Sequence, residues 1–302
     1  MSENRERCDV GLKKQQGIQS VKFEEPPIIC AAASVVGQKE GDGPFGDVFD
    51  QIESDPKVGG DTWEDAEGRL QERAAELAIQ KAGCGKEAIR YIVAGDLLGQ
   101  LMASSFGLAG FDKPLFGVYG ACSTMGESIG IGSMLVEGGF ADYVLAMTSS
   151  HFASAEKQFR FPLGYANQRP KASTWTVTGS GAVVICKGDQ KQGMAKITGI
   201  TTGKIVDYGV KDTMNMGACM APAAASVVAA HFKDFGTDPS EYDQIITGDL
   251  GMVGKDILID ILRSEGYDIA DRYIDCGIEI YGRDAQAQAG GSGCGCSAVM
   301  LA

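Results

Sequence analysis

One cysteine of this sequence has the surroundings of a nucleophile. Cys122 lies in the segment 120–128, GACSTMGES, between a strand predicted at 114–119 and a helix predicted to begin near Ser123. The unpaired N–H groups and positive dipole of a helix start lower the pKa of a thiol and favour the thiolate. Cys122 is therefore a candidate nucleophile for acyl transfer. The alternative is a small buried residue in a Gly/Ala turn.

A thiolate that acts on an acyl group needs a base or hydrogen-bond donor beside it. The sequence has two histidines, His151 and His231. His151 follows a predicted strand that ends at the same sheet edge as Cys122, so it could line the same cleft. The alternative is a loop histidine bonded to backbone. His231 has the spacing of a polar helix face, which favours the surface.

Hydroxyls and cations gather around His151. A carboxylate ligand would be held by an arginine fork, a lysine point charge and hydroxyl donors, whereas the alternative for such a segment is a solvated loop. The predicted ligand-binding residues are Cys122, Ser123, Ser149, Ser150, His151, Lys157 and Arg160.

These residues must be positioned by strands and helices in alternation. Apolar runs at 28–36, 89–94, 115–119, 142–148 and 181–187 predict strands, and helical patterns separate them, the clearest at 64–82. This alternation predicts an α/β fold.

The chain also resembles itself. Segment 89–98 is similar to segment 243–250, with Asp96 and Asp249 each ending a predicted strand. A second small-residue loop, 290–298, corresponds to the loop of Cys122. Equivalent loops at the carboxyl ends of strands predict one shared cleft, where open sheets usually bind ligands. The alternative is a chance match in a chain with 42 glycines.

Charge and composition exclude several function classes. The 302 residues, 44% of them hydrophobic, can bury a large core, and 27 basic against 40 acidic residues give a net charge of −13. This charge repels phosphate backbones and argues against a nucleic-acid partner. An anionic ligand must therefore meet a local cluster of donors, such as a helix start.

The chain shows no apolar signal segment and no run long enough to span a membrane, so membrane attachment is expected to go through a partner. Nine scattered cysteines indicate reduced thiols in a cytoplasmic-type compartment. Cys294 and Cys296 have no second pair at metal-binding spacing, so no metal site is predicted.

Eight ordered blocks, AGDLLGQ, GACSTMGES, SSHFASAEKQFRFPLGY, TVTGSGAVV, MGACMAPAAA, ITGDLG, DCGIEIY and AGGSGCGCSA, resemble the stage V sporulation protein AD family (SpoVAD) of the thiolase superfamily, from about Phe23 to the end. The resemblance implies a thiolase-like fold of two duplicated αβ halves in α-β-α-β-α layers. The expected parts are a flexible extension at 1–24, an N-terminal half at 25–190 and a C-terminal half at 191–302. The family pattern continues beyond Ala302, so we expect a shortened second half. Either the surface that this exposes is buried in a partner or dimer, or the chain is a shortened and less stable variant.

The resemblance also implies a function. It predicts a non-catalytic protein of the SpoVA complex that binds dipicolinic acid, alone or as its calcium chelate, for uptake in sporulation and release at germination. It further implies no cofactor, a homodimer, and association with the spore inner membrane of the forespore through other SpoVA membrane proteins. Asp249 and the loop around Gly291 stand where catalytic relatives place His or Asn, so the base is missing.

Two alternatives come from other function classes. One is a Cys-dependent acyltransferase or condensing enzyme that uses Cys122 with His151 as an unorthodox base. The other is a scaffold that docks membrane-bound partners and leaves its cleft empty. An acyl-Cys122 adduct would favour the enzyme, and calorimetry with dipicolinate separates the binding protein from the scaffold.

Overall fold

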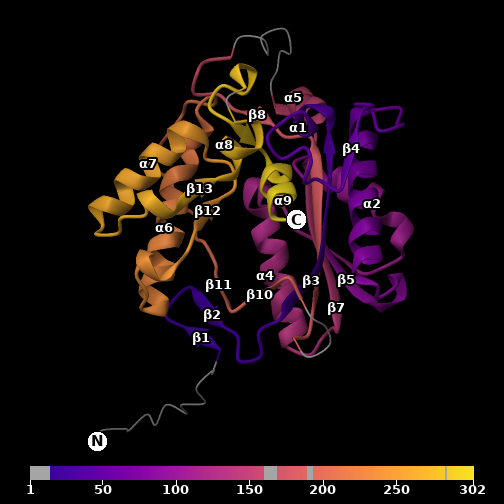
Figure 1. Cartoon of the computed structure of the whole chain (residues 1–302), viewed down its shortest axis with the longest axis horizontal. Coiled ribbons are helices and arrows are strands. Elements are labelled where there is room, and N and C mark those ends of the chain that lie inside the picture. The colour runs from indigo at the N-terminus through magenta and orange to yellow at the C-terminus, as the bar shows by residue number, and fades with distance from the viewer. Residues whose placement is uncertain (1–13, 160–168, 189–192, 283) are drawn as a thin grey trace, which may run out of the picture.

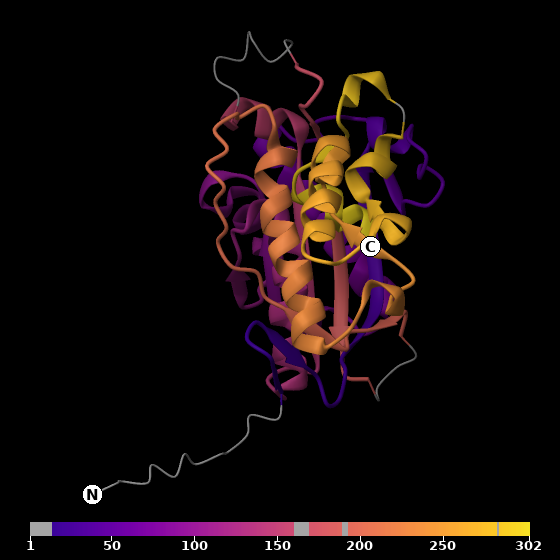
Figure 2. The ribbon, with the colours of Figure 1, turned by 90° about the vertical axis from the view of Figure 1, so that its left-hand side faces the viewer.

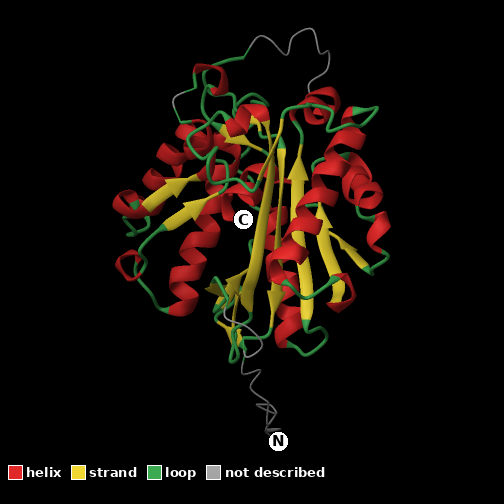
Figure 3. Ribbon diagram, turned by 45° about the vertical axis from the view of Figure 1, so that its right-hand side comes forward, coloured by secondary structure: helices red, strands yellow, loops and turns green. Residues whose placement is uncertain are grey.

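The five apolar runs predicted as strands all lie in one seven-stranded sheet (Figure 3). This is seen in the computed structural model, which describes residues 14–159, 169–188, 193–282 and 284–302. The order is β10-β3-β9-β7-β5-β6, with β4 paired to β3. The strands span Ala195–Lys196 (β10), Ile28–Gly37 (β3), Gly179–Cys186 (β9), Tyr143–Ser150 (β7), Ile89–Gly95 (β5), Leu115–Gly117 (β6) and Gln51–Glu53 (β4).

The sheet is mixed, and its central strands are buried on both faces. β9 runs antiparallel to β3 and β7, whereas β7, β5 and β6 are parallel. Every residue of β9 is buried. A strand covered on both faces reads as a continuous apolar run, which is why the sequence predicted these strands well. β10 joins this sheet from beyond the predicted boundary at residue 190.

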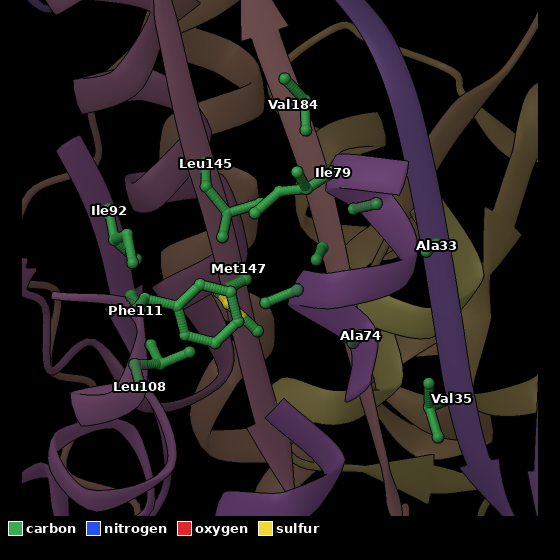
Figure 4. Close-up of a cluster of buried hydrophobic side chains, with 14 of the residues drawn as sticks. Ala33, Val35, Ala74, Ile79, Ile92, Leu108, Phe111, Leu145, Met147 and Val184 are labelled. Atoms are coloured by element: carbon green, nitrogen blue, oxygen red, sulfur yellow. The ribbon is translucent and has the colours of Figure 1, made fainter. Parts of the chain in front are cut away.

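Helix α2 (Trp63–Ala82) covers one face of the sheet. It begins where the Thr62 hydroxyl accepts the Asp65 N–H and ends at Gly83, whose φ of 60° is left-handed. Half of its buried residues are alanines, which lets the helix lie close to β3 and β9. Figure 4 shows this core, with Ala74 and Ile79 of α2 next to strand residues such as Leu145.

The opposite face is covered by α4 and α9, and the second half lies beyond them (Figure 1). There the parallel strands β12 and β13 pack against α6 and α7. The order of layers is therefore α2, the large sheet, α4 with α9, the small sheet, and α6 with α7. The bounds are Thr124–Glu137 (α4), Cys294–Leu301 (α9), Ile245–Thr247 (β12), Tyr273–Asp275 (β13), Met216–Phe235 (α6) and Gly251–Ser264 (α7).

Shorter elements complete the fold. They are the helices Gln38–Gly41 (α1), Met102–Gly107 (α3), Phe152–Phe159 (α5) and Cys276–Tyr281 (α8), and the strands Gln15–Gln16 (β1), Ser20–Lys22 (β2), Trp175–Thr176 (β8), Gly199–Thr201 (β11) and Gly291–Ser292 (β14). Figure 2 shows α6 lengthwise, with the irregular segment that follows β11 running beside it. Among the described residues, no helix has both the length and the apolar character needed to cross a bilayer.

The N-terminal segment differs from the expected flexible extension at 1–24. Residues 1–13 lie outside the described part, but β1 and β2 pair with each other, and β2 also pairs with β11. The Asp234 carboxylate on α6 accepts the N–H groups of Ile18 and Gln19 and the hydroxyl of Ser20. Residues 15–22 are thus tied to the second half through backbone pairing, which side-chain periodicity does not reveal.

Candidate functional site

The two small-residue loops meet at one place, as their correspondence predicted. The Cys122 thiol is hydrogen-bonded to the Asp249 carboxylate. Gly293, directly before α9, donates its N–H to Asp249 Oδ2 at 2.9 Å, and Cys294 also lies within electrostatic reach of Cys122. We call Cys122, Asp249, Gly293 and Cys294 the Cys122 site.

The backbone around Cys122 is built for a tight turn into α4. After β6 the chain passes through a short 3₁₀ turn, Ala121–Ser123, and Ala121 has a left-handed φ of 50°. A side chain on Gly120 would come 2.0 Å from the Glu127 carboxylate. Ser123 precedes α4 without a side-chain cap, so the first N–H groups of this 14-residue helix have no side-chain acceptor.

The surroundings of the Cys122 thiol disfavour the thiolate, one of the two interpretations that the sequence left open. Burial raises the pKa of Cys122, and the neighbouring Asp249 carboxylate raises it further, both by its charge and by accepting the thiol hydrogen. The start of α4 favours a thiolate, but this dipole effect is weaker than burial next to an acid. The half-buried Cys122 is a thiol at neutral pH.

Asp249 takes the position facing the thiol. Burial raises the pKa of Asp249 to about 6, although the bonds from Cys122 and from the Gly293 N–H lower it. The nearby Asp275 carboxylate contributes to the increase. An acid with this pKa is mostly ionised at pH 7 and cannot act as the strong base that thiolate formation requires.

His151 is bonded to backbone and does not reach the Cys122 site. Its Nε2 lies 2.8 Å from the carbonyl oxygen of Pro56, and its Nδ1 accepts the Ala153 N–H at 3.1 Å. This arrangement requires the neutral tautomer with the proton on Nε2, and burial lowers the pKa of the ring. Of the two interpretations left open by the sequence, the structural one is correct.

Ser149 and Ser150 are buried, and their hydroxyls are engaged. Ser149 donates to Glu67 at 2.9 Å, and Ser150 donates to the carbonyl of Val177 at 2.7 Å and accepts the Gly295 N–H at 3.0 Å. The donors of Ser149, Ser150 and His151 already have partners within the chain, so the predicted contact with a ligand would require these bonds to be displaced. Ser149 and Ser150 instead hold the start of α9, through bonds from Cys294 and Gly295.

The remaining predicted ligand residues are exposed or outside the described part. Lys157 is exposed and pairs with Glu64 at 2.6 Å. Ser123 is exposed beside Cys122 and donates to the Gly120 carbonyl, with Glu127 as a second acceptor. Arg160 lies outside the described residues. Cys122 and Ser123 are thus the members of the predicted set that the structure brings together at the surface.

The other candidate residues have structural roles. His231 is half-buried, bonded through its ring nitrogens to Thr201 and Tyr242, each at 2.8 Å, and is therefore less exposed than predicted. Cys294 and Cys296 donate to the carbonyls of Ser149 and Gly248. No set of three potential metal ligands clusters within the described ranges.

The sequence analysis did not identify two buried polar side chains of α2, Glu67 and Gln71. Glu67 and Gln71 lie on the buried face of α2, between alanines that contact the sheet. Glu67 accepts hydroxyls from Ser149 and Ser154, and Gln71 donates to Ser104 and Ser149. The signal was their spacing of four, in phase with the buried stripe of Ala74 and Ala78.

Known proteins resemble this chain in sequence and in fold. The family model described as "Stage V sporulation protein AD (SpoVAD)" matches residues 17–302. Stage V sporulation protein AD of Bacillus subtilis (strain 168) is 45% identical over 287 residues, which cover 95% of this chain and 84% of that protein.

Solved structures of condensing enzymes share the fold. A cerulenin complex of Xanthomonas campestris OleA has a TM-score of 0.60 at 15% identity and covers 93% of this chain and 88% of its own. The 3-oxoacyl-(acyl carrier protein) synthase III (FabH) of Pseudomonas aeruginosa PAO1 has a TM-score of 0.57 at 15% identity, with 91% and 87% covered. These likenesses confirm the thiolase-like α/β fold predicted from the sequence.

Proposed function

Because the chain belongs to the stage V sporulation protein AD family and is therefore a sporulation protein, we propose that it is a non-catalytic dipicolinic acid-binding protein of the SpoVA complex. It serves dipicolinate uptake during sporulation and release at germination. It acts in the forespore, at the inner membrane, through the other SpoVA membrane proteins and without a cofactor.

One observation carries the non-catalytic part of this proposal. The Cys122 thiol donates its hydrogen to Asp249, and burial together with this acid raises the pKa of Cys122. An acyl-transfer nucleophile needs the reverse, a neighbour that removes its proton. The imidazole of His151 is occupied by the Pro56 carbonyl and the Ala153 N–H, so it cannot supply that base.

The start of α4 supports the ligand part. It offers N–H groups without a side-chain acceptor and the positive end of the helix dipole, which together suit a carboxylate. The exposed Ser123 hydroxyl would join them by turning from its present acceptors, the Gly120 carbonyl and Glu127. Asp249 and Glu127 lie next to these donors and repel a free dianion. A calcium chelate of dipicolinate would meet less repulsion, because the cation offsets the acids. We therefore include the chelate as the preferred form.

Self-association belongs to the same proposal. β6 is the outer strand of the described sheet, and its residues Leu115, Phe116 and Gly117 are all exposed. An exposed apolar edge strand is a template for pairing, and a second copy would cover it. Sedimentation at increasing protein concentration tests this dimer.

Calorimetry with dipicolinate, with and without calcium, tests the ligand. Ser123→Asp puts a negative charge at the helix start. Ser123→Asn is the control, because asparagine has the size of aspartate but no charge. A charge about 5 Å from a carboxylate costs on the order of 1 to 3 kcal/mol, or about 5- to 150-fold in affinity. We expect this loss for Ser123→Asp and little change for Ser123→Asn. If both variants bind dipicolinate as tightly as the parent, the ligand does not bind at this helix start.

A second pair of variants examines the predicted cations. Arg160→Ala should weaken binding about 30-fold or more if this side chain holds a carboxylate. Lys157→Ala is the control, because Lys157 is exposed and paired with Glu64.

Incubation with an acetyl thioester tests the non-catalytic part of the proposal. Steady turnover that Cys122→Ala abolishes would establish an enzyme in place of a binding protein.

A further inference from the structure

A buried chain of hydrogen bonds joins two acids on different elements. Asp96, at the end of β5, accepts the Ser104 hydroxyl at 2.6 Å. Gln71 donates to Ser104 at 3.0 Å and to Ser149 at 2.8 Å. Ser149 in turn donates to Glu67 Oε1 at 2.9 Å. All five side chains are buried, so the chain is shielded from water along its length.

The two acids differ in the donors they meet. Asp96 accepts two backbone N–H groups, from Leu98 and Ser104, each at 2.8 Å, besides the Ser104 hydroxyl. Glu67 meets hydroxyls alone within the described part of the chain, those of Ser149 and Ser154. Backbone N–H groups stabilise a buried carboxylate, whereas a fully buried acid without them favours its neutral form. Burial raises the pKa of Asp96 as well, but the bonds from Ser104 and Leu98 lower it, so Asp96 is the acid of the pair that carries the charge.

The hydrogen count around Ser154 leads to the same assignment. Its hydroxyl oxygen lies 2.7 Å from Glu67 Oε2 and 3.0 Å from the carbonyl oxygen of His151. A serine has one hydrogen for these two contacts. If Glu67 carries a proton and donates it to Ser154, the serine hydrogen is available to His151 and both contacts become hydrogen bonds.

We propose that Glu67 keeps a proton at neutral pH and acts as a proton-operated latch that holds α2 against the junction of β7 and α5. When the proton leaves, Ser154 must turn its one hydrogen toward Glu67 and lose the bond to His151. The new charge then lies in the same buried network as that of Asp96. The first change removes a bond within the junction, and the second places two negative charges in one buried network, which destabilises the packing of α2 against the junction.

The acids around Glu67 favour its protonated form. Burial, the Asp96 carboxylate and, to a smaller extent, Glu64 together raise the pKa of Glu67 to about 8, although the bonds from Ser154 and Ser149 lower it. The Cys294 thiol, on α9, also faces Glu67. The cation on the adjoining α5, Lys157, is exposed and pairs with Glu64.

The latch reaches the Cys122 site through the end of β7. The carbonyl of Ser149 accepts the Cys294 thiol at 2.9 Å, and the Ser150 hydroxyl accepts the Gly295 N–H at 3.0 Å. These bonds fix the start of α9, where Gly293 donates to Asp249. Release of the latch at alkaline pH should therefore loosen the start of α9.

Infrared spectroscopy of the full chain tests the protonation directly. A buried protonated carboxyl gives a carbonyl band apart from those of carboxylates, and the spectrum of the parent minus that of Glu67→Gln at pH 7 should contain this band. Glu40, another buried acid whose pKa is raised by burial, contributes equally to both spectra and cancels. Glu72→Gln, which changes an exposed acid on the same helix, is the control and should give no such difference. The difference band should fade as the pH passes through about 8. A difference spectrum without this band at pH 7 overturns the proposal.

Stability and amide exchange test the latch itself. Gln imitates the protonated acid, so Glu67→Gln should fold. Relative to this variant, the parent folding equilibrium constant should fall about tenfold per pH unit between about pH 5 and pH 8. Amide exchange at residues 293–297, taken as a ratio to Glu67→Gln at each pH, should rise above pH 8. A constant ratio, or a variant that fails to fold, overturns the latch. No ligand is needed, so these outcomes are separate from those that test dipicolinate binding.

Discussion

The raised pKa of Asp249, the acid of the Cys122 site, leads to a quantitative prediction about stability. The pKa of Asp249 rises from 3.8 to about 6 in the folded chain, because the carboxyl is buried. The unfolded chain releases this proton near pH 4, whereas the folded chain holds it to about pH 6. Stability from this group is therefore full below pH 4 and is lost as the pH rises through 6.

Asp249→Asn removes this titration and keeps the size of the side chain. A shift of about 2 units corresponds to about 3 kcal/mol, of which about 2 kcal/mol is lost between pH 4 and pH 7. The asparagine oxygen can still accept the Gly293 N–H, but its amide hydrogens lack the partner that the acid had in Cys122, at a cost of about 1 kcal/mol. The pH dependence is the cleaner signal, because this cost is the same at every pH.

The assay is urea unfolding of parent and variant at several pH values from 4 to 8. The free energy of unfolding of Asp249→Asn, minus that of the parent, should increase by about 2 kcal/mol from pH 4 to pH 7. Asp256→Asn changes an exposed acid on α7 and should show no such increase. A difference for Asp249→Asn that is the same at pH 4 and pH 7 refutes the argument that a buried acid keeps Cys122 as a thiol.

Three other changes test the packing that holds the site. Gly217→Ala places a methyl group 2.5 Å from the Leu250 carbonyl, so it should lower the free energy of unfolding by about 1 to 3 kcal/mol in urea titration. Glu156→Gln leaves the buried Arg169 guanidinium without its carboxylate at 2.7 Å, and should cost about 3 kcal/mol by the same assay. Asp234→Ala removes the acceptor of three donors in segment 18–20 and should lower the melting temperature in calorimetry; an unchanged value would restore the flexible extension.

The sequence predicted the frame of this protein well because its signals were local. Central strands buried on both faces are unbroken apolar runs, and α2 has its cap, its alanine stripe and its terminal glycine within 22 residues. The meeting of the two loops also followed from the sequence, because a repeated unit places equivalent loops at equivalent strand ends. The pairing of β1 and β2 did not, since two- and three-residue strands carry no periodicity.

The chemistry of the site was less accessible because it depends on distant partners. The sequence interpretation of Cys122 as a thiolate rested on the helix that follows it. In the structure, the neighbour with the largest effect on the pKa of Cys122 is Asp249, from the other half. His151 was placed near the correct strand end, yet the Pro56 carbonyl decides its role. Neither partner is visible from residues close in sequence.

Asp96 and Asp249 end corresponding segments of the two halves, but they have different roles. Asp96 accepts the N–H groups of Leu98 and Ser104 and so organises the loop that follows its own strand. In the second half that task belongs to Asp275, which accepts the N–H groups of Leu250 and Gly251 from the loop after Asp249. Asp249 is thereby left with few local bonds and can turn toward Cys122. Because Asp275 on the neighbouring strand β13 holds the loop after Asp249, a substitution at Asp249 alone should leave this loop folded.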